Sequence, residues 1–298
     1  MFIKTNKETT GFIFALSDMV TYGLVAVFAN YFVRNINPQL FAATTTLLGS
    51  FPLLIQLKIQ NKQYDLYSPK FLPYFLIISL LTAIATSLFF AGTKLTSGIN
   101  TGLLIQLEPI YAIILAGIFL KEVITGNQIA VTIVMVLGAL FLVYKGTSQL
   151  NFGDILILIT PIFFQISHLF SKRIVDKVSD VNIIPAARLF YSGIILTVFA
   201  FVINPLSFKQ ILDFNNFISI IFFAFIFRTL DLALWYQAIA RISIAKASAL
   251  IPFAAVVSFT GSIIFLKEVP RLNQYIGLVL ILGGLTYLSL IHLKTAKE

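Results

Sequence analysis

Ten apolar runs, each of roughly 20 residues, follow one another along this chain of 298 residues, with short polar breaks between them. A helix of about 20 residues crosses the roughly 30 Å hydrocarbon core of a bilayer, because each residue adds about 1.5 Å. The chain is 58% apolar and 11% charged, whereas a soluble domain carries about 25% charged residues. We therefore predict an all-α polytopic membrane protein with ten transmembrane helices. The runs cover residues 11–33, 40–57, 71–93, 99–120, 128–144, 152–171, 184–204, 217–239, 245–266 and 275–293.

A duplicated pattern divides the chain into two related halves. The string Phe-Leu-Lys-Glu-Val occurs at residues 119–123 and again at 265–269, and Asn-Gln and Gly follow both copies at the same spacing, so the offset is 146 residues. We assign residues 1–147 to a first repeat and residues 148–298 to a second. Each repeat holds five helices, and this odd number sends the second repeat into the membrane the opposite way up. The expected architecture is two inverted five-helix repeats related by a pseudo-two-fold axis in the membrane plane.

The basic residues lie mainly in the breaks between apolar runs, on one side of the membrane. The two termini and the breaks on their side carry 13 Lys and Arg, the other side carries 6, and two remain inside the runs. The positive-inside rule therefore predicts cytoplasmic termini in a multi-pass protein of the cell inner membrane. The net charge of +9 is explained by helix orientation, so we expect membrane lipid as a partner and no nucleic acid.

The residues that are missing exclude several kinds of function. The chain has no cysteine and two isolated histidines, so we expect no metal site and no cofactor. It holds no phosphate-binding Gly-rich loop and no metalloprotease or Ser/His/Asp pattern, so neither direct use of ATP nor enzymatic catalysis is expected. Channels and scaffolds are also built from duplicated membrane domains. Two mirrored ways of opening a central site favour a secondary transporter that works by alternating access.

Both halves together resemble the EamA family of the drug/metabolite transporter superfamily. The resemblance rests on two five-helix halves, on Pro109 in the fourth helix, on Glu122 13 residues beyond it, and on Gly138 in the fifth helix. It covers essentially the whole chain. It implies export or exchange of amino acids and other small metabolites, through a cavity between the third, fourth, eighth and ninth helices and parts of the first and sixth.

The sequence and the resemblance together lead to one expected function and one alternative. The expected function is export of a small polar or zwitterionic metabolite, such as an amino acid, across the inner membrane. The alternative is uptake or exchange of a metabolite on the same fold. Protons or another ion are candidate coupling partners, and the oligomeric state stays open.

Glu108 is the ionisable residue that most needs an explanation, because it lies about 14 Å deep in the fourth run. A charge at the bilayer centre costs roughly 2.5 to 3.5 kcal/mol on insertion scales. Pro109, beside it, frees a backbone carbonyl one turn earlier. We consider two interpretations: a carboxylate that faces the cavity and binds a coupling proton or cation, or a buried acid paired with a neighbouring helix for structure.

Arg228 and Asp231 lie three residues apart near the middle of the eighth run, so they share a helix face. One interpretation is a structural ion pair, and the other is a pair that opens to bind the carboxylate and amine of a zwitterionic substrate. Trp235, one turn on, is the only tryptophan. Its ring either contacts the substrate or, as we favour, marks the membrane interface.

Asp18 and Tyr22 share one face of the first run. Asp18 is either a second acid of the cavity or a hydrogen-bonded structural group. Arg188 lies four residues inside the seventh run, where we favour anchoring at the interface by extension of the side chain over substrate binding. His168, near the end of the sixth run, is expected at the interface rather than in a proton relay.

The remaining candidates are structural or gating residues. Gly98 and Gly102 open the fourth run, and small residues four apart let helices approach closely. Pro252 lies one turn before the counterpart of Pro109, so the ninth helix is expected to bend nearer its start. Glu122 and Glu268 are expected to contact another helix, either for structure or to close a gate.

Overall fold

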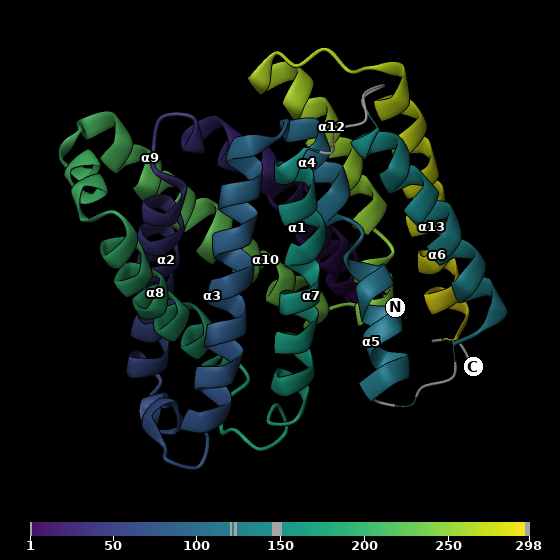
Figure 1. The fold of residues 1–298 in the computed structure, drawn as a ribbon. Coiled ribbons are helices and arrows are strands. Elements are labelled where there is room, and N and C mark those ends of the chain that lie inside the picture. Colours follow the sequence, from purple (N-terminus) through teal and green to yellow (C-terminus); the bar gives the residue numbers. More distant parts are fainter. Residues whose placement is uncertain (1, 120, 122–123, 145–150, 296–298) are drawn as a thin grey trace.

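The computed structural model describes residues 2–119, 121, 124–144 and 151–295, and all the regular structure in them is helical. Figure 1 shows the resulting bundle. The α-helices of the first half are α1 (Phe2–Val33), α2 (Pro38–Ile59), α3 (Leu72–Leu95), α4 (Gly98–Ile105), α5 (Glu108–Phe119) and α6 (Gly126–Val143). Those of the second half are α7 (Phe152–Lys172), α8 (Ile183–Ile203), α9 (Phe214–Ala224), α10 (Asp231–Ile239), α11 (Ile244–Ser248), α12 (Ile251–Leu266) and α13 (Leu272–Thr295). Two 3₁₀ helices, η1 (Gln63–Tyr67) and η2 (Pro205–Leu212), lie between spans, and the π-helix η3 (Phe225–Leu230) joins α9 to α10.

Ten spans of membrane-crossing length and apolarity are found in the described residues, as the sequence predicts. Their bounds agree with the predicted runs to within a few residues. Three of the spans are composite: α4 with α5, α9 with η3 and α10, and α11 with α12. Large apolar side chains such as Ile133, Leu140 and Val279 are more than half exposed on the outside of the bundle, where lipid chains would surround them.

Two proline residues account for the breaks in the fourth and ninth spans. Pro109 is the second residue of α5 and Pro252 is the second residue of α12. Proline fits the first turn of a helix, where its missing N–H would have no partner, but it disrupts a helix interior. The predicted bend near the start of the ninth span is confirmed, because α11 ends at Ser248 and α12 starts at Ile251.

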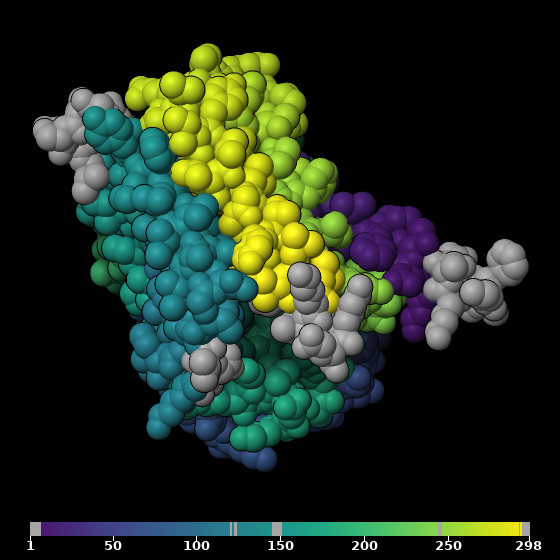
Figure 2. Space-filling view, turned by 90° about the vertical axis from the view of Figure 1, so that its right-hand side faces the viewer, coloured from purple at the N-terminus to yellow at the C-terminus, as the bar shows by residue number. Residues whose placement is uncertain are grey.

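Helices from the two halves pack against one another throughout the bundle. The most extensive pairings are α3 with α7, α2 with α8, α6 with α13, and α1 with α12. In the repeat, α3 corresponds to the span that contains α10, and α7 corresponds to α1. The pairing of α3 with α7 therefore predicts a pairing of α10 with α1, which is also present. Figure 2 shows α6 and α13 side by side on one outer face. This pattern fits two related halves, and their inverted relation stays a prediction.

Glycine residues bring α4 unusually close to α12. A Cβ atom on Gly102 would overlap the side chain of Ser258, and one on Gly98 would overlap that of Leu266. The contact joins the fourth and ninth spans, which occupy equivalent positions in the two halves. Only residues without a side chain allow this approach. A gating role for Gly98 and Gly102 remains a prediction.

An even number of spans returns the chain to the side from which it starts. We call this side the termini end; it includes the connections at residues 60–71 and 173–182. The opposite end includes residues 34–37, 204–213 and 267–271. The two ends differ in how they are closed, and this difference positions the candidate site.

Candidate functional site

A cavity of about 600 Å³ lies inside the bundle and reaches the surface at the termini end. Its walls come from α1, α3, α4, α5, α7, α8, η3 and α10. Lys172 and Val181 belong to its mouth, and Val181 is 42% exposed. The resemblance implied a wall from the ninth span, but no described residue of α11 or α12 lines this cavity, whereas residues of α8 do. The seventh span therefore takes part in the site.

Glu108 is held at the inner part of the cavity by donors from two other helices. Gln165 Nε2 donates to its Oε1 at 2.7 Å, and the Tyr22 hydroxyl donates to its Oε2 at 3.3 Å. His168 Nε2 lies 3.8 Å from Oε1. The residue opens α5, where the positive end of the helix dipole stabilises a carboxylate. The Glu108 carboxylate is therefore surrounded by two neutral donors and one imidazole. These groups come from α1 of the first half and α7 of the second half.

Gln165 and His168 were not predicted as cavity residues. Both lie on α7, three residues apart, so they share the face that points to Glu108. His168, which we expected at the interface, lines the cavity with a side chain that is 49% exposed, and its depth in the membrane stays a prediction. The sequence contained a usable signal: two polar side chains at helical spacing within an apolar run are typical of a lined cavity.

Arg188 also points into the cavity instead of extending to the membrane interface. Its Nε donates to the hydroxyl of Thr82 at 2.9 Å, and its guanidinium lies 5.3 Å from the ring centre of Phe164. The expected interface anchoring is therefore wrong. The physical reason is that Thr82 and the aromatic face of Phe164 offer partners inside the bundle.

Arg228 and Asp231 line the same cavity without forming an ion pair within 4 Å of each other. Arg228 belongs to η3, whose wider π turn changes the angle between residues three apart. Asp231 instead accepts a hydrogen bond from the Thr21 hydroxyl of α1 at 2.9 Å. This geometry does not support the interpretation of Arg228 and Asp231 as a structural ion pair.

Two further predicted residues differ in their access to the cavity. Trp235 belongs to its wall, together with Phe164, Phe227 and Tyr236, so its ring faces the space that a ligand would fill. Asp18 is 4% exposed and is not one of the residues that line the cavity; it belongs to α1, which packs against α10. The interface position that we favoured for Trp235 and its contact with a substrate both stay predictions.

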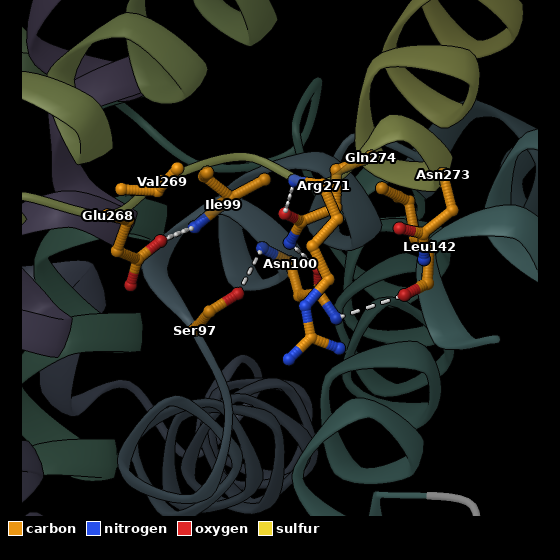
Figure 3. A pocket seen from close by; sticks show the side chains of 9 residues that line it. All are labelled: Ser97, Ile99, Asn100, Leu142, Glu268, Val269, Arg271, Asn273 and Gln274. Atoms are coloured by element: carbon orange, nitrogen blue, oxygen red, sulfur yellow. Dashed lines mark hydrogen bonds between the residues drawn. The ribbon is translucent and has the colours of Figure 1, made fainter. Parts of the chain in front are cut away.

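A second, smaller cavity of about 230 Å³ lies at the opposite end, beside the start of α4 (Figure 3). Glu268 accepts hydrogen bonds from the backbone N–H groups of Gly98 at 2.7 Å and Ile99 at 2.9 Å. Asn100 accepts from Gln274 at 2.8 Å and donates to the Leu142 carbonyl and to Asp154. Carboxylate and amide groups therefore tie α4, α6, α7 and α13 together at this end.

The remaining predictions have simple outcomes. The expected contact of Glu268 with another helix is present, and it caps α4. Glu122 lies outside the described residues. Within the described part of the chain, no group of three or more His, Cys, Asp or Glu side chains could hold a metal ion.

Comparison with known proteins gives the chain a family context. The sequence model of the EamA-like transporter family matches residues 9–144 and 151–290. The uncharacterized transporter YoaV of Bacillus subtilis (strain 168) is 22% identical, with 91% of this chain and 93% of YoaV aligned. A probable amino-acid metabolite efflux pump of Escherichia coli (strain K12) is 23% identical, with 96% of each chain aligned. One crystal structure matches 98% of this chain and 99% of its own with a TM-score of 0.65 at 14% identity, which shows a shared fold.

Proposed function

Because the chain belongs to the EamA-like transporter family, we propose that it is a secondary transporter of a small zwitterionic metabolite, with amino acids as the first candidates. The observation that carries this proposal is the cavity that contains Glu108. It encloses charged groups of both signs and aromatic rings, and exposed residues at the termini end form its mouth. Export is the direction we propose, because the relative from Escherichia coli is named an efflux pump.

Glu108 is the group we propose for coupling. Its carboxylate can bind either a proton or the ammonium of a substrate, and Gln165 and Tyr22 keep it oriented in both states. The Glu108 carboxylate can bind the proton or the substrate ammonium, but not both at once. Binding of one therefore weakens binding of the other. This arrangement would drive export of an amino acid by entry of a proton.

We also propose an orientation in the membrane. The 13 basic residues on the side of the termini, against 6 on the other, support cytoplasmic termini in an inner membrane. The cavity then opens to the cytoplasm, which fits a state that is ready to load a metabolite for export. The alternative of uptake or exchange uses the same cavity with the opposite gradient.

The test is transport by the purified chain in liposomes. Radiolabelled amino acids are expected to show counterflow without chemical change, and a pH gradient is expected to drive their accumulation. Glu108→Gln should lower the proton-driven rate about ten- to hundredfold, which corresponds to one charge-assisted interaction. Glu8→Gln is the control, because Glu8 does not line the cavity.

Different results would separate the alternatives. Full proton-driven transport by a folded Glu108→Gln protein would remove the coupling role. A modified product would indicate an enzyme, and conductance without saturation would indicate a channel. Accumulation in the opposite direction relative to the proton gradient would support the uptake carrier.

A further inference from the structure

Two arginine side chains of the cavity have far fewer acceptors than donors. An arginine carries five N–H donors and no acceptor. Arg188 uses one of them on Thr82. Arg228 has no hydrogen-bond acceptor among the described residues, and its Nε is fully buried without a partner. Neither guanidinium has an Asp or Glu oxygen within 4 Å in the part of the chain that the structure describes.

The acids of the same cavity are already provided with donors. Glu108 accepts from Gln165 and Tyr22, and Asp231 accepts from Thr21. The carboxylates are therefore oriented by neutral groups, while the guanidinium groups remain available. Both arginines line the same cavity. An anion beside them would accept their free N–H groups through charge-assisted hydrogen bonds.

Arg228 is held in place without an anion. Its guanidinium lies 5.4 Å from the ring centre of Phe90 and 6.0 Å from that of Phe223. Gly49 of α2 packs against its Cβ, where any larger residue would collide. The π turn of η3 sets its direction. A buried cation that is fixed by ring faces and backbone contacts, with its donors unused, is prepared for an incoming acceptor.

We propose that Arg188 and Arg228 form an anion subsite that binds the carboxylate of an organic solute, with the guanidinium groups as hydrogen-bond donors. The proposal rests on the proposed transport function and names the chemistry of its substrate: a carboxylate is required, and an amine is not sufficient. The apolar part of the solute lies against Phe164, Phe227 and Trp235. An amino acid fits when its ammonium reaches Glu108.

The test uses the full chain purified in detergent and its thermal unfolding in the presence of matched solutes. The first set is leucine, isocaproate, which lacks the amine, and isoamylamine, which lacks the carboxylate. The second is phenylalanine, hydrocinnamate and phenethylamine. Sodium phosphate distinguishes an organic carboxylate from a simple oxyanion. At least one carboxylate of the panel is expected to raise the unfolding temperature in a saturable manner, while the matching amine does not.

Substitutions then connect binding to the two arginines. Arg228→Gln and Arg188→Gln should each raise the apparent Kd about tenfold or more, since each loses charge-assisted hydrogen bonds. Arg228→Lys keeps the charge and loses the planar fork, so an intermediate loss is expected. Arg241→Gln is the matched control, because Arg241 also stacks on a phenylalanine ring, Phe14, but lies outside the cavity. Unfolding without ligand checks that each variant is folded, and Arg188→Gln decides if the Arg228 variants do not fold.

Three results would overturn the subsite: no carboxylate stabilises the protein, the amines stabilise it as well as the carboxylates do, or affinity survives both substitutions to Gln. Stabilisation by phosphate alone would also overturn it as a subsite for an organic solute. Counterflow of a solute that binds without a carboxylate would keep the transport function and remove this inference. Carboxylate binding without any counterflow would keep the subsite and remove the transport function.

Discussion

The two ends of the bundle contain the same repeated positions in two different arrangements. At the opposite end, Asn100 is buried and donates to Asp154, which is fully buried. The residue 146 positions after Asn100 is Lys246, which forms an ion pair with Glu8 at the termini end, with both side chains nearly half exposed. The start of the fourth span is thus held by a buried contact, whereas the start of the ninth span is held by an exposed ion pair at the end where the cavity opens.

The cap on α4 shows the same difference. Glu268 of the second half binds the first two N–H groups of α4 and lies 3.9 Å from Arg34. Its repeat counterpart is Glu122, and the counterparts of Gly98 and Ile99 are Ile244 and Ala245 at the start of α11. The bonds of Glu268 stabilise the closed end, so they oppose opening there. Related halves with unequal ends are what an alternating-access carrier requires.

The largest expected difference between the ends is in access to thiol reagents. The chain has no cysteine, so a single introduced cysteine reports on one position. Val181→Cys at the cavity mouth should react with a polar maleimide on the order of a hundredfold faster than Ile99→Cys, because a buried thiol reacts only after local opening. The rates are measured by mass spectrometry on the purified protein. Similar rates at both positions would mean that the opposite end is not closed in solution.

The Glu268 cap is expected to have the next largest effect. Glu268→Gln keeps the shape but loses the charge, which should cost about 1.5 to 3 kcal/mol of closed-end stability. Labelling of Ile99→Cys should then rise about ten- to hundredfold. Glu8→Gln is the matched control at the termini end; its exposed ion pair with Lys246 is worth about 1 kcal/mol or less. Equal effects of the two substitutions would contradict the proposed asymmetry.

The sequence predicts the spans and the duplication because both depend on local pattern. A run of about 20 apolar residues forms a membrane-spanning helix in a bilayer. A proline inside such a run can mark a break in the helix, as Pro109 and Pro252 do. Glu108 was also identified, because a deep acid is costly enough to indicate a site. These inferences need no knowledge of how the helices are packed.

The direction of a polar side chain could not be predicted in the same way. Arg188 and His168 lie near span ends and line the cavity. A polar side chain near a span end can either extend to the interface or point into a cavity. The rotation of each helix decides between these positions, and it is set by neighbours such as Thr82 that are distant in sequence. For Arg228 and Asp231, the π turn η3 removed the expected i, i+3 geometry. Tertiary packing therefore determined the parts of the site that the sequence left open.

The smallest predicted effect concerns a polar contact at the termini end. Lys62 Nζ lies 2.6 Å from Asp180 Oδ2 and connects the loops of the two halves there. Partial burial raises the pKa of Asp180, but hydrogen bonds from Lys62 and Asn182 outweigh it, so the pKa lies below its ordinary value of 3.8. A carboxylate with a lowered pKa stabilises the folded state above that ordinary value, and the contribution is lost as the pH falls through the folded pKa. Asp180→Asn should therefore lower stability at pH 7 by about 0.2 to 1 kcal/mol. Thermal unfolding between pH 7 and pH 3 is expected to show this difference shrinking below about pH 4.

Asp176→Asn, an exposed position in the same loop, is the control. A difference that stays constant with pH would assign the effect of Asp180 to packing instead of charge. An effect as large as that of Glu268→Gln would show that both ends are tightly closed.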